Sequence, residues 1–161
     1  MGKYSTALVM IIFQLTGIFS CSEELKPTPY VYTKIFTGEN SKTWKCKFLE
    51  QTLNGSITDT FTVSCSTDDL YTFFANPEHS YQVKTGSKKC FTTPEADVIN
   101  DTWNFNNASA TLSMILPFFD DTSPLPFILI DVTKSKMVTE IFLDQNNTES
   151  YRIHFESTNE N

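Results

Sequence analysis

The side chains best suited to chemistry are four cysteines, two histidines and two pairs of adjacent carboxylates. Cysteines and histidines a few residues apart can bind a metal, and a cysteine beside a base can act as a nucleophile. Neither arrangement occurs: there is no CxxC spacing, and His79 and His154 have no cysteine or second histidine nearby. Asp68–Asp69 and Asp120–Asp121 could bind calcium, but adjacent carboxylates are more typical of a solvated surface. We therefore predict no metal site, no cofactor and no catalytic residue, and we expect that the protein is not an enzyme.

The positions of Cys65 and Cys90 predict a disulfide. The turn-forming residues 76–79 lie midway between them, so the two cysteines would face each other at the open end of a hairpin. Closing a loop of this size stabilises a fold by roughly 3 to 3.5 kcal/mol in the chain-entropy model. Two buried free thiols are the alternative. Cys46 alternates with aromatic neighbours and is expected to be a small buried apolar side chain.

The length and net charge of the chain indicate a single domain and exclude two classes of ligand. The chain has 161 residues, of which 40% are hydrophobic and 14% aromatic, which is enough for one folded domain with a core. Its formal net charge is −7, from 12 basic and 19 acidic residues. Nucleic acids and anionic bilayer surfaces both require clustered cations, so we expect neither as a ligand.

After residue 40 the apolar residues alternate with a period of two, which predicts strands. The predicted strands lie around residues 44–48, 71–74, 81–84, 103–105, 112–116, 127–132, 137–143 and 151–155. Short clusters of turn-forming residues separate most of them, which favours a meander. Closing the meander into a barrel removes its exposed edges. We therefore predict an all-β fold with an eight-stranded antiparallel up-and-down barrel, and a two-sheet sandwich is the alternative.

The longest gap between predicted strands covers residues 53–67. We expect this segment to be a loop that crosses one mouth of the barrel. The alternative is an extra strand containing Ile57, Phe61 and Val63.

The first twenty residues have the composition of an export signal. Lys3 precedes an apolar run over residues 7–13, which is too short to span a membrane. The sequence Ile18-Phe19-Ser20-Cys21 then resembles the signal of bacterial lipoproteins. This resemblance implies that residues 1–20 are a signal peptide and that Cys21 carries the lipid. Two or more acyl chains hold a protein stably on a membrane.

The residues after Cys21 refine the expected location. Ser22-Glu23-Glu24 resembles the surface-export signal of Bacteroidetes lipoproteins, although so short a stretch also arises by chance. The resemblance implies a lipid anchor in the outer membrane of the cell envelope, with display on the cell surface. Prolines among residues 25–40 predict an extended tether. The expected division is a signal peptide over 1–20, the lipidated cysteine and tether over 21–40, and the barrel domain over 41–161.

Several segments of the barrel domain resemble the lipocalin-like domains of Bacteroidetes lipoproteins. These segments are Ser41–Lys45, Cys65–Phe73 with Tyr81, Gly86 and Lys89–Cys90, Trp103–Phe105 with Leu112, the apolar strand to Val132, and Tyr151–Ile153. The resemblance covers residues 36–156 and implies a barrel, open at one mouth, that binds small apolar molecules. It also implies that a basic side chain covers Trp44 by a cation–π contact, and Arg152 is the candidate. An ordinary core tryptophan and a solvated arginine are the alternative. Lys42 stands where lipocalins usually carry glycine.

The candidate ligand-binding residues are aromatic residues on the expected inward face of three consecutive strands. They are Tyr71, Phe73, Tyr81, Trp103 and Phe105. Such rings can line an apolar site, or they can fill a barrel that has room for only side chains or one small ligand. We therefore expect a monomeric, non-catalytic envelope lipoprotein that binds a small hydrophobic ligand. A cell-surface interaction module with a filled barrel, binding a protein or a glycan, is the alternative.

Overall fold

The computed structural model describes residues 30–90 and 97–158. The predicted signal peptide and Cys21 lie outside the described residues. The elements are α2 (Tyr30–Thr37), β1 (Ser41–Leu53), β2 (Ser56–Phe61), β3 (Leu70–Phe74), β4 (Ser80–Lys84), β5 (Val98–Thr102), β6 (Asn104–Asn106), β7 (Thr111–Leu116), β8 (Asp120–Val132), β9 (Lys136–Phe142) and β10 (Glu149–Ser157).

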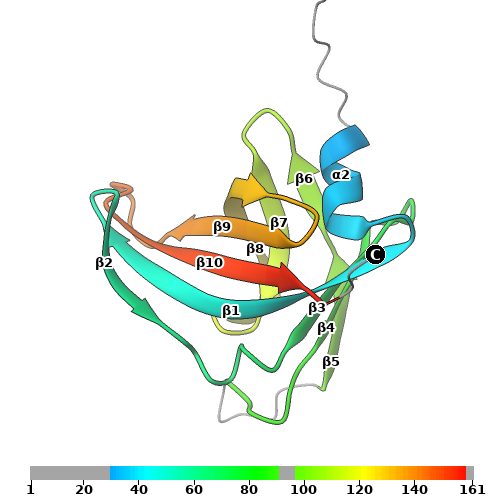
Figure 1. Ribbon diagram of the computed structural model, residues 1–161, viewed down its shortest axis with the longest axis horizontal. Coiled ribbons are helices and arrows are strands. Elements are labelled where there is room, and N and C mark those ends of the chain that lie inside the picture. The colour runs from blue at the N-terminus through cyan, green and yellow to red at the C-terminus, as the bar shows by residue number, and fades with distance from the viewer. Residues whose placement is uncertain (1–29, 91–96, 159–161) are drawn as a thin grey trace, which may run out of the picture.

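The strands form one antiparallel sheet that is nearly closed into a barrel (Figure 1). Along the sheet the order is β5-β4-β3-β1-β10-β9-β8-β7-β6, and β2 pairs with β1 beside this path. The two strands at the ends of the order, β5 and β6, are joined through the single residue Trp103. The chain itself therefore bridges the seam of the barrel. The predicted all-β antiparallel barrel is confirmed.

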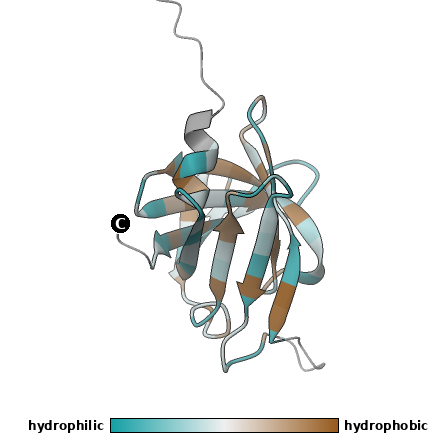
Figure 2. Ribbon diagram, turned by 90° about the vertical axis from the view of Figure 1, so that its right-hand side faces the viewer, coloured by the Kyte–Doolittle hydropathy of each residue, from teal (hydrophilic) through white to brown (hydrophobic). Residues whose placement is uncertain are grey.

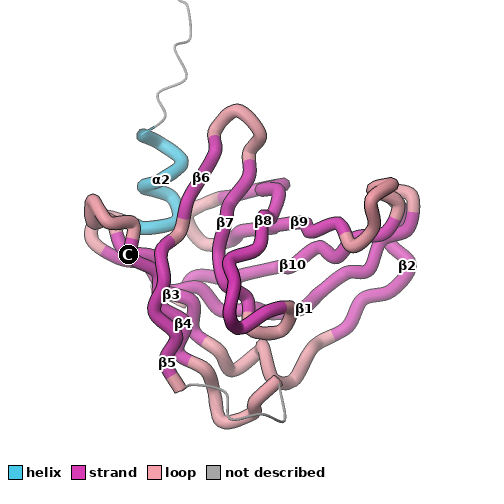
Figure 3. The backbone as a smooth tube through the Cα atoms, turned by 180° about the vertical axis from the view of Figure 1, so that it is seen from behind, coloured by secondary structure: helices cyan, strands magenta, loops and turns pink. Residues whose placement is uncertain are grey.

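The number of strands differs from the prediction, because the sheet has ten strands rather than eight. The first addition is β5, which precedes the predicted strand around residues 103–105; that strand corresponds to β6. Between the two, the Trp103 N–H donates to the His79 carbonyl at 2.8 Å, outside the strand ladder. The second addition is β2. Residues 53–67 therefore contain an extra strand, which was the alternative prediction (Figure 3). The prediction of a loop across the barrel mouth is wrong for residues 56–61.

Strand β1 is long enough to pair with two different strands along one of its edges. Its first residues, Ser41–Trp44, pair with β3, and its last residues, Leu49–Leu53, pair with β2. Its other side pairs with β10 over nearly its full length. A bulge between Cys46 and Phe48 shifts the register against β10. Such a bulge bends the strand, and here it keeps both Cys46 and Leu49 buried.

The core follows the alternation of the strands, in which hydrophobic and hydrophilic residues succeed one another (Figure 2). On β9, for example, Met137, Thr139 and Ile141 are buried, with at most 9% of each exposed. The fully buried large side chains include Trp44, Tyr71, Tyr81, Phe36, Phe73, Phe127 and Phe155. Burying apolar surface of this kind is the main favourable term in folding.

The start of the folded domain also differs from the prediction. Residues 30–37, expected to belong to an extended tether, form α2, which lies at one end of the barrel (Figure 1). Phe36 of this helix is completely buried. Helix α2 is therefore part of the barrel core, although the amphipathic stretch that forms it is only eight residues long.

Candidate functional site

Four of the five predicted ligand-binding residues are core residues. Tyr71 and Phe73 are completely buried, and Tyr81 and Trp103 are at most 3% exposed. The ring of Phe73 lies 4.8 Å from that of Tyr81 and 6.2 Å from that of Trp103, centre to centre. Such distances are those of packed aromatic pairs. Tyr71 packs instead against Phe155, with 5.6 Å between the ring centres. The structure thus brings Phe73, Tyr81 and Trp103 together, but as the filling of one half of the barrel.

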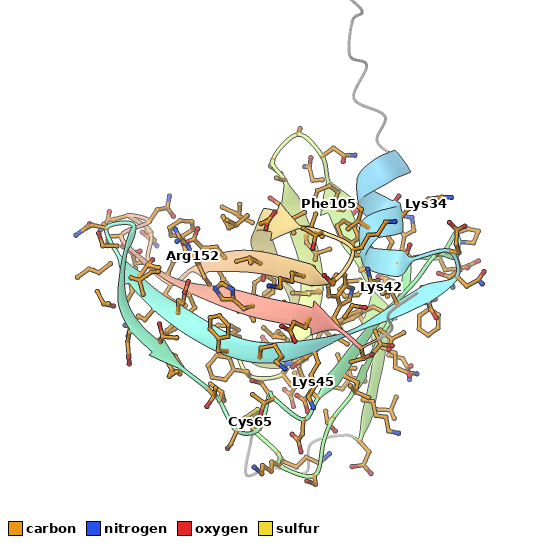
Figure 4. The ribbon with its side chains drawn as sticks, in the orientation of Figure 1. Lys34, Lys42, Lys45, Cys65, Phe105 and Arg152 are labelled. Carbon is orange, nitrogen blue, oxygen red and sulfur yellow. A yellow bond between two sulfur atoms is a disulfide. The ribbon has the colours of Figure 1, made fainter. Side chains whose placement is uncertain are left out.

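Phe36 completes this aromatic cluster from outside the sheet. Its ring centre lies 6.3 Å from Phe73, 5.7 Å from Trp103 and 5.2 Å from Phe105. Phe105, the fifth predicted residue, is half-buried at the end of the barrel beside α2 (Figure 4). Phe36 was not among the residues predicted from the sequence. The signal was present in the apolar pairs Val31-Tyr32 and Ile35-Phe36, which recur one helical turn apart.

The polar groups of the buried rings are used within the protein. The Tyr71 hydroxyl donates to Asp69 Oδ2 at 3.2 Å, and the Tyr81 hydroxyl donates to the Ile115 carbonyl at 2.8 Å. Trp103 Nε1 donates to the Phe74 carbonyl at 3.2 Å. Burial raises the pKa of both tyrosines well above its usual value. These hydroxyls are therefore neutral structural donors.

The basic side chain over Trp44 is Lys42, and the pairing expected with Arg152 is wrong. Lys42 Nζ lies 4.4 Å from the centre of the Trp44 ring. It also donates to the carbonyl of Ile35 at 3.0 Å and to that of Lys134. Burial, together with the charge of Lys134, lowers the pKa of Lys42. This lysine fastens α2 and the turn between β8 and β9 to the end of the barrel.

Arg152 lies elsewhere on the sheet, over β9 and β10 and far from α2 (Figure 4). Its Nε is 3.2 Å from Glu140 Oε1, an oxygen that also accepts a hydrogen bond from Ser150 Oγ at 2.7 Å. Arg152 and Glu140 occupy facing positions on the two strands. Both belong to the face of the sheet opposite to the one that carries Ile141 and Ile153. Arg152 is thus an outer-face residue.

The predicted disulfide between Cys65 and Cys90 is confirmed. It joins the two loops that flank the β3–β4 hairpin, at the end of the barrel away from α2 (Figure 4). Asp68 strengthens the same junction, since its Oδ2 accepts hydrogen bonds from Ser87 Oγ and the Lys88 N–H, each at 3.2 Å. A Cβ atom at Gly86 would lie 2.1 Å from Asp68 Cγ, so this approach requires glycine.

Two further groups with possible reactivity are structural. Cys46 is buried, as expected, and burial raises the pKa of its thiol to about 11. Asp69 is 1% exposed and accepts a hydrogen bond from the Gly86 N–H at 2.7 Å, which makes it a loop anchor rather than a calcium ligand. Among residues 30–90 and 97–158, no three His, Cys, Asp or Glu side chains are placed to hold a metal ion.

A second aromatic cluster, which the sequence analysis did not predict, is only partly buried. It consists of Phe61, Phe118, Phe119 and Tyr151, from β2, the β7–β8 turn and β10. The Tyr151 ring lies 5.9 Å from Phe61 and 5.9 Å from Phe119, and Phe119 lies 6.1 Å from Phe127 in the core. We call these four residues the mouth cluster. They are contributed by elements far apart in sequence, and only the pairing of β2 with β1 brings Phe61 to them.

Comparison with known proteins does not place the chain in a family: no family model matches it, and neither does any curated protein. In the part of the chain that the structure describes, no helix is long and apolar enough to cross a membrane. The function therefore has to be inferred from the barrel and the contacts within it.

Proposed function

We propose that this protein is a non-catalytic lipoprotein of the cell envelope that binds a small hydrophobic ligand in its barrel. The observation that carries the proposal is the mouth cluster. Its four aromatic rings pack against the core but are only partly buried, unlike Phe73 and Trp103 beside Phe36, which are at most 3% exposed. Half-buried rings that converge on an apolar interior are the surface that a small apolar molecule binds.

The proposed ligand site is not formed by the aromatic residues that were predicted from the sequence to bind the ligand. Phe73, Tyr81 and Trp103 are packed in one cluster with Phe36 of α2, and Tyr71 is completely buried against Phe155, so these four rings support the site without lining it. The ligand would instead contact Phe61 and Tyr151, next to Phe119. The surroundings are apolar, since Ile141, the cross-strand partner of Tyr151, is also buried. A monomer without a cofactor is sufficient for this activity.

Native mass spectrometry of the purified full chain tests the proposal. We expect an added mass that disappears on extraction with organic solvent. Phe61→Ala, which shortens one wall of the mouth cluster, should reduce the fraction of protein carrying that mass several-fold. Phe142→Ala is the matched control, because Phe142 follows Ile141 on β9 and therefore points to the outer face. A wild-type protein that carries no added mass, and whose melting temperature is unchanged by apolar ligands, would refute ligand binding.

The lipid anchor is part of the proposal and has a separate test. Cys21→Ser should move the protein from the membrane fraction to the soluble fraction, because loss of all acyl chains removes the only anchor proposed for it. Fractionation followed by immunodetection measures the change. Cys46→Ser, which changes a buried thiol in the barrel, should leave the protein with the membranes. If the Cys21→Ser protein still sediments with membranes, the proposed anchor is wrong.

One observation favours the second candidate, a cell-surface module that binds a protein or glycan partner. The half of the barrel near α2 is filled by its own side chains, as such a module requires. If the wild-type protein is bare in the native spectrum, a filled barrel follows and the outer surfaces become the candidates for partner binding.

A further inference from the structure

A buried hydroxyl next to the mouth cluster has no hydrogen-bond partner within residues 30–90 and 97–158. Thr139 is 0% exposed, and its Oγ1 has no hydrogen-bond partner among the residues that the structure describes. It lies on β9 between Met137 and Ile141, both buried, so its side chain points to the barrel interior. Leaving a buried hydroxyl without a partner is costly, and native proteins do so rarely.

The neighbours of Thr139 place this hydroxyl beside the mouth cluster. Its cross-strand partners are Ile153 on β10 and Leu129 on β8. One step further along the same face, two residues away on each strand, lie Tyr151 and Phe127. The Phe119 ring contacts both of these residues. Phe119 therefore covers the interior surface immediately next to Thr139.

The position of Phe119 allows it to move without disturbing the sheet. It belongs to the short turn between β7 and β8, and its ring is only partly buried. Its N–H donates to the Leu116 carbonyl at 2.8 Å, which holds the backbone of the turn but leaves the side chain free to change rotamer. Turning the ring outward would uncover Tyr151, Phe127 and the hydroxyl beyond them.

From this arrangement we propose that Thr139 is the polar anchor of the ligand site and that Phe119 is the ring the ligand displaces. The inference rests on the proposed ligand-binding function. The ligand class that fits is an apolar molecule with one uncharged hydrogen-bonding group, such as a hydroxyl or a carbonyl. A carboxylate fits poorly, because the residues around Thr139, namely Ile153, Leu129 and Ile141, offer no compensating charge.

Three probes with the same ring system test separately the need for an apolar body, for a hydrogen-bonding group and for the absence of charge. They are naphthalene, 2-naphthol and 2-naphthoate. Isothermal titration calorimetry on the full chain measures their affinities. The wild type should bind 2-naphthol at least as tightly as naphthalene, and 2-naphthoate at least tenfold more weakly than 2-naphthol. In Thr139→Val, which keeps the shape and removes the hydroxyl, the affinity for 2-naphthol should fall about tenfold, while that for naphthalene should change less than twofold.

Two further variants serve as controls. Thr139→Ser keeps the hydroxyl and should retain the wild-type preference for 2-naphthol. Phe119→Ala removes the ring to be displaced, so it should bind naphthalene several-fold more tightly than the wild type, whereas Phe142→Ala on the outer face of β9 should not.

The outcomes distinguish the inference from the function on which it rests. If Thr139→Val loses affinity for naphthalene and 2-naphthol equally, or keeps the wild-type affinity for 2-naphthol, the anchor is refuted and ligand binding stands. If the wild type binds none of the three probes, the proposed binding of small hydrophobic ligands is refuted as well. Thr139→Val should melt no lower than the wild type, because it removes an unpaired polar group, so unfolding would not explain a loss.

Discussion

Replacing Trp44 by alanine is expected to lower the free energy of unfolding by about 4 kcal/mol. The ring is completely buried, and large aromatic truncations in a core cost about 3–5 kcal/mol. Trp44 Nε1 also donates to the Phe36 carbonyl at 2.9 Å, so the substitution leaves a buried carbonyl without this donor. The Lys42 ammonium loses the ring beneath it as well. Urea titration followed by circular dichroism measures the change.

Trp44→Phe separates the contributions of packing and hydrogen bonding. It keeps an aromatic ring but has no N–H, so we expect a loss of about 2 kcal/mol, roughly half of the alanine value. A loss below 1 kcal/mol for Trp44→Ala would contradict the burial of this ring. Arg152→Ala is a useful comparison, since Arg152 pairs with Glu140 and does not cover Trp44.

Removing the disulfide is expected to have the second largest effect on stability. Cys65 and Cys90 are separated by 25 residues, and closing such a loop in the unfolded chain contributes about 3.5 kcal/mol in the chain-entropy model. The Cys65→Ser/Cys90→Ser double variant should therefore unfold at a lower urea concentration by an amount corresponding to this loss. Non-reducing peptide mapping should show the Cys65–Cys90 linkage in the wild type.

Two controls accompany the disulfide variant. Cys46→Ala leaves the disulfide intact and should cost only about 1 kcal/mol, because it removes one small buried atom. Adding a reductant should destabilise the wild type but not the double variant. If the double variant is as stable as the wild type, contacts other than the disulfide hold the loops at 65–69 and 85–90 together. The hydrogen bonds of Asp68 and Asp69 are the strongest candidates for such contacts.

The features predicted correctly from the sequence have local causes. The alternation of period two depends on the pleat of each strand, and the eight strands predicted from the apolar pattern overlap eight of the ten strands of the sheet. The disulfide was predictable because hairpin β3–β4 has its turn midway between the two cysteines. Cys46 was predictable as a buried thiol for the same reason, because it lies on the inward face of β1.

The features that were missed depend on contacts between distant segments. Residues 30–37 contain few signals of a helix on their own, and α2 is positioned by Phe36 packing among Phe73, Trp103 and Phe105. Arg152 and Lys42 both offer a cation, and only the register of β10 against β9 shows that Glu140 pairs with Arg152. The mouth cluster depends on the pairing of β2 with β1.

The place of α2 in the barrel has a consequence for how an anchored protein would be oriented. Residue 21, proposed to carry the lipid, precedes the start of α2 at residue 30 by nine residues, which span at most about 32 Å. The end of the barrel closed by α2 would therefore lie within about 32 Å of the anchored residue. The β7–β8 turn with Phe119 lies at the other end (Figure 3). A ligand of the proposed kind that enters beside Phe119 would then do so at the end of the barrel opposite to the anchored one.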